Sequence, residues 1–139
     1  MLWYNVLFGL KGRLNRRGFW IGLLINFVFL LIAVIFMVDL ANFTFLTFLP
    51  LWISVFSLSA IIVKRLHDRD RSGQALLMVL VPIICYLASL YTQGIMQILL
   101  GNVMPAVITM ILLLEWGVFK GNRNPNKYGE RGLSFKLRE

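Results

Sequence analysis

The segment KRLHDRDRSG, from Lys64 to Gly73, holds the densest collection of side chains that could do chemistry. It combines four basic residues with two aspartates and the only histidine of the chain. Arginine guanidinium groups bind phosphate through paired hydrogen bonds, and a helix starting after Ser72 would add backbone N–H donors for an anion. The segment is therefore one candidate for a phosphate-binding site, with the residues Arg65, His67, Asp68, Arg69, Arg71, Ser72 and Gly73.

Two other interpretations of this segment stay open. It could be a solvated loop whose aspartates and arginines pair locally at little energetic gain. His67 titrates near neutral pH, so His67 and Asp68 could also serve a lipid-modifying enzyme, although adjacent positions need not face each other. The sequence has no glycine-rich nucleotide loop and no nucleophile elbow, and this favours a non-enzymatic protein without a cofactor.

A metal site is not expected in this chain. The arginines that flank Asp68 and Asp70 would neutralise these carboxylates and repel a cation. With one cysteine, Cys85, and one histidine, the chain lacks the ligands of a tetrahedral zinc site.

The composition is that of a membrane protein. Of the 139 residues, 59% are hydrophobic and 14% are charged, and the mean hydropathy is +0.78. A soluble domain has about 25% charged residues, and a small globule has too little interior to bury this apolar excess. About 20 apolar residues cross a bilayer. We expect an all-α membrane protein, a single domain over 1–139 that forms a four-transmembrane-helix bundle with spans at about 19–40, 43–63, 75–91 and 103–119.

The segments between and beside these spans complete the expected fold. Residues 1–18 place apolar side chains at helical spacing beside a basic cluster, which predicts an N-terminal amphipathic helix in the membrane interface; a frayed terminus is the alternative. The stretch 92–102 is expected to be an interfacial or partly re-entrant turn, and Pro105 to lie in the first turn of the fourth span. Residues 120–139 are expected to form a cytoplasmic tail.

The distribution of charge predicts the topology. All fourteen Lys and Arg residues lie before 18, within 64–71 or after 119, and the loops 39–44 and 92–102 contain none. Positive residues are retained on the cytoplasmic side, so both termini should be cytoplasmic in a multi-pass membrane protein. Because the basic residues flank apolar spans, the net charge of +8 indicates contact with the lipid bilayer and its anionic phospholipid headgroups, and not with nucleic acid.

Glu115 is the only acidic residue well inside a predicted span. An ionisable side chain there suggests a function, because its burial in lipid is costly. Glu115 could instead pair with an arginine of 64–71, a structural role that we favour slightly. With the prolines at 50 and 82 it could also line the path of a small transporter or channel, and four short spans would then require a homo-oligomer.

Three stretches together resemble a bacterial inner-membrane family that is numbered 805 among the domains of unknown function. FGLKGRLNRRGFW (8–20) resembles its opening motif, KRLHDRDRSG its central signature and NPNKYGERG (124–132) its closing motif. The resemblance implies a small four-helix protein of the cytoplasmic membrane without a settled activity. Its motifs single out Gly12, Arg13, Arg16 or Arg17, Trp20, Arg65, Leu66, His67, Asp68, Arg71, Ser72, Gly73, Asn126, Tyr128 and Gly129.

The resemblance also shapes the favoured hypothesis. Gln74 stands where an aromatic residue often follows the central signature, so no stacking role is expected there. We expect the three motifs to dock together on the cytoplasmic face and to bind an anionic lipid headgroup or a protein partner. Asp68 and Asn126 would orient the charged side chains and Gly73 would permit close approach, while the charge would come from Arg13, Arg17, Arg65, Arg69 and Arg71.

Overall fold

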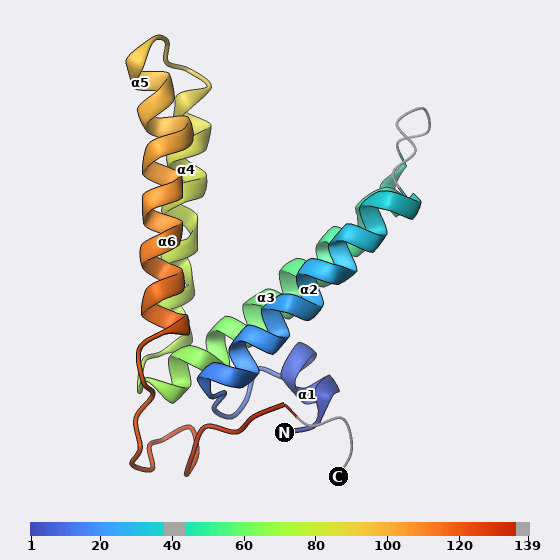
Figure 1. Cartoon of the computed structure of the whole chain (residues 1–139), viewed down its shortest axis with the longest axis vertical. Helices are drawn as coiled ribbons and strands as arrows, with labels where there is room; N and C mark the ends of the chain where they lie inside the picture. Colours follow the sequence, from blue (N-terminus) through green and yellow to red (C-terminus); the bar gives the residue numbers. More distant parts are fainter. Residues whose placement is uncertain (38–43, 136–139) are drawn as a thin grey trace. The chain divides into compact units, whose positions relative to one another are not determined.

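The computed structural model describes residues 1–37 and 44–135, and within them all regular structure is helical apart from two isolated β-bridges. The all-α prediction is therefore confirmed. The chain forms two compact units, residues 1–73 with the segment from 120 onward, and residues 74–119. The elements, drawn in Figure 1, are α1 (Trp3–Phe8), α2 (Arg16–Met37), η1 (Phe45–Phe48), α3 (Leu49–Asp68), η2 (Gly73–Val79), α4 (Leu80–Ser89), α5 (Ile95–Ile98), η3 (Leu99–Val103) and α6 (Met104–Gly117).

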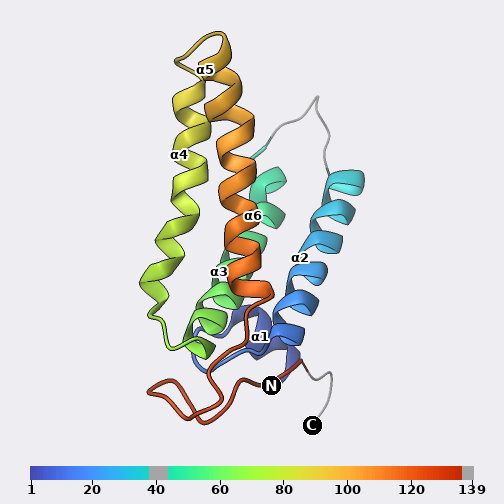
Figure 2. The same ribbon diagram turned by 60° about the vertical axis from the view of Figure 1, so that its left-hand side comes forward.

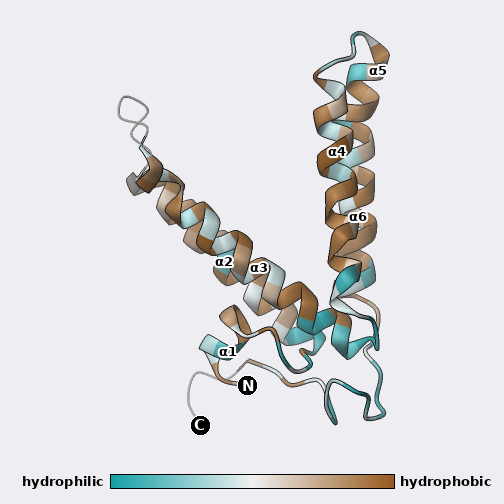
Figure 3. Ribbon diagram, turned by 180° about the vertical axis from the view of Figure 1, so that it is seen from behind, coloured by the Kyte–Doolittle hydropathy of each residue, from teal (hydrophilic) through white to brown (hydrophobic). Residues whose placement is uncertain are grey.

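Several of these helices are suited to cross a membrane. Among the described residues, three helical stretches are long and apolar enough: Arg16–Phe36, Phe45–Asp68 and Ile95–Gly117. A shorter apolar stretch covers Gly73–Ser89. Figure 3 shows that α2 and α3 are mostly hydrophobic along their length and hydrophilic at the end beside the tail. The chain is thus a helical membrane protein; the predicted boundaries at 40 and 43 lie outside the described residues.

The predicted loop beginning at Lys64 is wrong in its first half, because α3 continues to Asp68. The helix ends in a Schellman motif, in which the Arg71 N–H donates to the carbonyl of Leu66 at 2.9 Å and the Asp70 N–H to that of His67 at 3.2 Å. Asp70 takes the left-handed conformation that this motif requires, with φ 58°. The charged residues 64–68 therefore project from a rigid helix and not from a loop.

The turn predicted for 92–102 is also wrong over most of its length. Gly94, with φ 65°, ends the turn, and the chain is then helical from Ile95 through η3 into α6. Pro105 lies in the first turn of α6, as predicted, but η3 precedes α6 without a break in the helix. Proline has no N–H, so the carbonyl of Gly101, four residues before Pro105, receives no hydrogen bond from it. Gly101 lies in η3, the π-helical turn directly before α6.

In the first unit, α2 and α3 run antiparallel, side by side (Figures 1 and 2). A side chain at Gly22 would overlap Ile61, so glycine allows the close approach of the two helices. Asn26 Nδ2 donates to Ser57 Oγ at 3.0 Å, which links the helices within the apolar region. Ser57 thus lies at the helix contact, whereas the hydroxyl of Ser59 donates to the carbonyl of Val55 in its own helix.

Helix α1 packs against α3 in the same unit. The buried amino group of Lys64 donates to the carbonyl of Val6 at 2.6 Å and also to that of Asn5, at the end of α1. The ring of Phe8 stacks on that of Phe56 with centroids 6.5 Å apart. The helix is shorter than the apolar periodicity of 1–18 predicts, because it ends at Phe8.

In the second unit, η2 and α4 run antiparallel to the long helix formed by α5, η3 and α6 (Figure 2). Gly101 lies against Ser89, where an added Cβ would come within 2.9 Å of the serine Oγ. The Ser89 hydroxyl donates to the carbonyl of Tyr86 at 2.6 Å, so its polar group is satisfied without water. Glu115 belongs to this unit and lies near the end of α6 at Gly117; its pairing with 64–71 stays a prediction.

Candidate functional site

Asp68 is the centre of a buried ion-pair cluster at the end of α3. Only 4% of the residue is exposed. Its Oδ1 lies 3.1 Å from Arg13 Nη2, and its Oδ2 lies 2.6 Å from Arg65 Nη1. Both arginine side chains are fully buried. Burying a charge is costly unless it is paired and hydrogen-bonded, so each group of this cluster depends on the others.

Arg13 also fastens the tail to the cluster. Its Nη1 donates to the carbonyls of Asn124 at 2.9 Å and Gly129 at 3.1 Å, and its Nη2 donates to the carbonyl of Asn122. The Asn122 N–H in turn donates to the carbonyl of Asp68 at 2.7 Å. One guanidinium group therefore joins the segment before α2, the end of α3 and the tail.

Two glycines bring the tail backbone close to the carboxylate. An added Cβ at either Gly121 or Gly132 would overlap the carboxylate oxygens of Asp68. Just beyond Gly132, the Leu133 N–H donates to the carbonyl of Arg13 at 3.0 Å, and the Asn15 N–H donates to the carbonyl of Leu133 at 3.0 Å. The main chain at Gly121 and Gly132 thus lies against the carboxylate at a distance that only glycine permits.

His67 and the closing motif form a second set of contacts. The rings of His67 and Tyr128 stack at 3.8 Å with an interplanar angle of 5°. Asn126 Nδ2 donates to the carbonyl of His67 at 2.8 Å, while its Oδ1 accepts the Tyr128 N–H at 2.9 Å. His67 Nδ1 lies 3.1 Å from the carbonyl oxygen of Gly12. His67 and Asp68 therefore have different partners, and this geometry gives no support to a catalytic pair.

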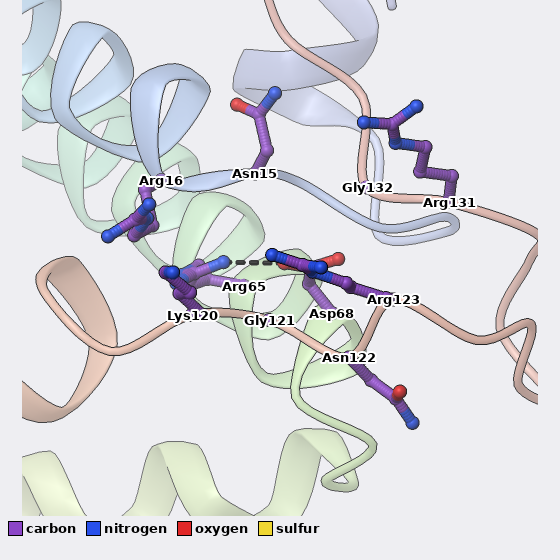
Figure 4. Close-up of a pocket in the computed structure, with 10 residues that line it drawn as sticks. All are labelled: Asn15, Arg16, Arg65, Asp68, Lys120, Gly121, Asn122, Arg123, Arg131 and Gly132. Carbon is purple, nitrogen blue, oxygen red and sulfur yellow. Dashed lines mark hydrogen bonds and ion pairs between the residues drawn. The ribbon is translucent and has the colours of Figure 1, made fainter.

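A cavity of about 550 Å³ opens beside the Asp68 cluster (Figure 4). Five of its lining residues are basic and one, Asp68, is acidic. At its edge α2 begins, and Asn15 Oδ1 accepts the Gly18 N–H at 2.8 Å as the N-cap of that helix. The positive end of the helix dipole adds to the basic side chains. The lining consists of Asn15, Arg16, Arg65, Asp68, Lys120, Gly121, Asn122, Arg123, Arg131 and Gly132.

The structure brings together part of the predicted site. Arg13, Arg65 and Asp68 form the buried cluster, and His67, Asn126 and Tyr128 form the stacked contacts. Of the predicted residues, only Arg65 and Asp68 line the cavity. The remaining predicted residues lie elsewhere in the first unit. Arg17 and Trp20 occupy exposed positions of α2, and the segment after α3 holds Arg69, Arg71, Ser72 and Gly73. The ligand-binding roles of all these residues stay predictions.

Four basic residues of the cavity are absent from the predicted site. Lys120, Arg123 and Arg131 belong to the segment predicted only as a cytoplasmic tail. Their one sequence signal is their position in or just before the closing motif; Lys120 and Arg131 also adjoin Gly121 and Gly132, which pack against Asp68. Arg16 is singled out only by the family resemblance, as an alternative to Arg17. Within residues 1–37 and 44–135, no group of three or more His, Cys, Asp or Glu could hold a metal ion.

The apolar helices, with a basic tail docked on the end of α3, are those of a helical membrane protein. Comparison with known proteins gives its family. The chain matches the family described as "Protein of unknown function (DUF805)" over residues 7–130, and it belongs to that family. It is 33% identical over 129 residues to the uncharacterized protein YiiR of Escherichia coli K12, covering 89% of this chain and 86% of YiiR.

A second relative is described as an inner-membrane protein. Inner membrane protein YhaI of Escherichia coli K12 is 37% identical over 95 residues, covering 65% of this chain and 80% of YhaI. This similarity and the apolar helices support a bacterial inner-membrane protein. No solved structure shows a significant match to the chain.

Proposed function

We propose that this protein is a non-enzymatic, four-span inner-membrane protein that binds the phosphate of an anionic lipid headgroup in the cavity beside Asp68. The observation that carries the proposal is the lining of that cavity. It holds five basic residues, and its one carboxylate is already paired with Arg13 and Arg65. Arginine forks and a helix N-terminus are the groups that proteins use to bind phosphate.

The position of the cavity favours a lipid as the source of the phosphate. Arg16 lines the cavity and is the first residue of α2, which is a candidate membrane span. Trp20 follows one turn later and is 46% exposed. Tryptophan is enriched at the level of lipid headgroups, so the cavity would open at that level.

The lengths of the helices support four spans. The stretch Gly73–Ser89 has seven residues in a 3₁₀ helix, which rise about 2.0 Å each, and ten in an α-helix, which rise about 1.5 Å each. The sum is about 29 Å, close to the hydrocarbon thickness of about 30 Å. Four spans place both termini on one side, and the basic segments make that side cytoplasmic.

Helix α1 would lie in the cytoplasmic interface of the membrane. Its aromatic residues Trp3, Tyr4 and Phe8 are exposed, which suits a helix at the boundary of lipid and water. The amino group of Met1 donates to the carbonyl of Ser134 at 3.1 Å, so the N-terminus is held beside the polar tail.

The proposal is tested by the thermal stability of the full-length protein in phosphatidylcholine nanodiscs with and without phosphatidylglycerol. A ligand that binds only the folded protein raises its Tm, so phosphatidylglycerol should raise the Tm of the wild type. The double variant Arg123→Gln/Arg131→Gln should lose this increase. The control Lys11→Gln/Lys127→Gln removes the same charge from exposed positions outside the cavity and should keep it. Equal increases in both variants would refute the proposal.

A further inference from the structure

We infer that the headgroup taken by this cavity carries two phosphates, as in a diphosphate-linked lipid. The inference rests on the proposed function and specifies the chemistry of the ligand. It depends on three features of the first unit: the charge of the cavity lining, the volume of the cavity, and the exposed face of α2 that continues from it.

The charge of the lining exceeds what one phosphate can balance. Asp68 is neutralised by its two buried arginine partners, a cluster that retains one positive charge. Four more basic side chains, Arg16, Lys120, Arg123 and Arg131, line the same cavity. A phosphodiester carries one negative charge and a phosphate monoester about two near pH 7. A second linked phosphate adds a further ionised group and balances the lining more closely.

The basic side chains lie in two places around the cavity. Figure 4 shows Arg16, Arg65 and Lys120 together on one side, whereas Arg131 stands apart on the other side with Arg123 between. Two separate groups of donors match two phosphates better than one, because each phosphate can then accept charge-assisted hydrogen bonds from its own arginine.

The volume agrees with a ligand larger than one phosphate. Small-molecule sites occupy roughly 300–1,000 Å³, and the cavity of about 550 Å³ lies within this range. One phosphate would fill only a small part of this volume.

An exposed apolar stripe on α2 provides a path for the lipid chain. Starting from Arg16 at the cavity, the positions four, eight, eleven and fifteen residues later lie on one helical face. All four side chains on this stripe are large, apolar and exposed: Trp20, Leu24, Phe27 and Leu31. Together with the basic cavity, this stripe favours a membrane-anchored diphosphate over free pyrophosphate.

The test is a competition experiment by native mass spectrometry on the full-length protein. Farnesyl diphosphate and farnesyl monophosphate are supplied at equal concentration, and inorganic pyrophosphate is added to a separate sample. The wild type should carry the diphosphate lipid at least tenfold more often than the monophosphate. Arg131→Gln should reduce this preference, and Lys11→Gln, at an exposed position outside the lining, should leave it unchanged.

Each other outcome overturns a specific statement. Equal occupancy by the two lipids would overturn the two-phosphate inference and leave the proposed headgroup site intact. Pyrophosphate binding as tight as that of the diphosphate lipid would overturn the assignment to a lipid. Absence of all three ligands, with no stabilisation by phosphatidylglycerol, would overturn the inference and the proposed function together.

Discussion

Asp68 holds the polar end of the first unit together through ion pairs with two arginines, one of which is distant in the sequence. Arg65 lies three residues before it on the same helix, but Arg13 is fifty-five positions away in the sequence. Both arginines are fully buried. These two arginines therefore fix the tail and the end of α3, whereas under the proposed function the exposed basic residues of the tail would contact the ligand.

Replacing Asp68 with asparagine should destabilise the protein strongly. The change removes the carboxylate charge that pairs with the buried Arg13 and Arg65, and breaking a buried pair in this way costs about 3–5 kcal/mol. Thermal unfolding of the purified protein in lipid measures the loss. Asp70→Asn is the matched control, because Asp70 is exposed and asparagine tolerates its left-handed backbone. Similar melting of the two variants would contradict the structural role of Asp68.

At the scale of elements, α2 and α3 meet through small and polar side chains as well as apolar ones such as Ile61. Asn26 and Ser57 share the hydrogen bond between the helices, whereas the buried hydroxyl of Ser54 has no hydrogen-bond partner among the described residues. In a membrane such bonds contribute modestly, because the separated helices find other partners.

These two serines make a matched pair of variants. Ser57→Ala should destabilise the protein by about 0.6 kcal/mol, the average for hydrogen bonds between membrane helices, and at most by about 1.7 kcal/mol. Ser54→Ala should be neutral or slightly stabilising, because it removes a buried polar group that makes no bond. Unfolding in detergent by a denaturing surfactant gives both values. A larger loss for Ser54→Ala than for Ser57→Ala would contradict this packing.

The docking of the tail depends on glycine at two positions, and Gly132 offers a test. Gly132→Ala introduces a Cβ that overlaps the Asp68 carboxylate, so the tail should detach or shift. Limited proteolysis should then cut the tail several-fold faster than in the wild type. Ser134→Ala should leave the rate unchanged, because Ser134 contributes its backbone carbonyl to the contact with Met1. Wild-type protection of Gly132→Ala would argue against the docked tail.

For the whole molecule, hydrophobicity and charge were enough to predict a helical membrane protein, because lipid accepts only backbone that satisfies its own hydrogen bonds. The end of α3 was mispredicted, since charged residues such as Lys64 look solvated until their distant partners are known. The convergence of Arg13, Asp68 and Asn126 followed from the family motifs. The cavity did not, because Lys120, Arg123 and Arg131 acquire their positions only when the tail folds back.

The four-span topology predicts which residues face each side of the membrane. In a Cys85→Ala background, Gln93→Cys lies between α4 and α5 and should react with a membrane-impermeant maleimide added to intact spheroplasts. Lys127→Cys, in the basic tail, should react only after the cells are broken. Labelling of both positions from outside would contradict four spans with a cytoplasmic tail.

The central claim, that the basic cavity binds a lipid phosphate, is tested most directly by solid-state NMR. Protein with ¹⁵N-labelled arginine in phosphatidylglycerol bilayers should show dipolar dephasing between guanidinium nitrogens and lipid ³¹P, as hydrogen-bonded groups require. The dephasing should largely disappear in Arg123→Gln/Arg131→Gln and persist in Lys11→Gln/Lys127→Gln. Undiminished dephasing in the cavity variant, or none in the wild type, would contradict the claim.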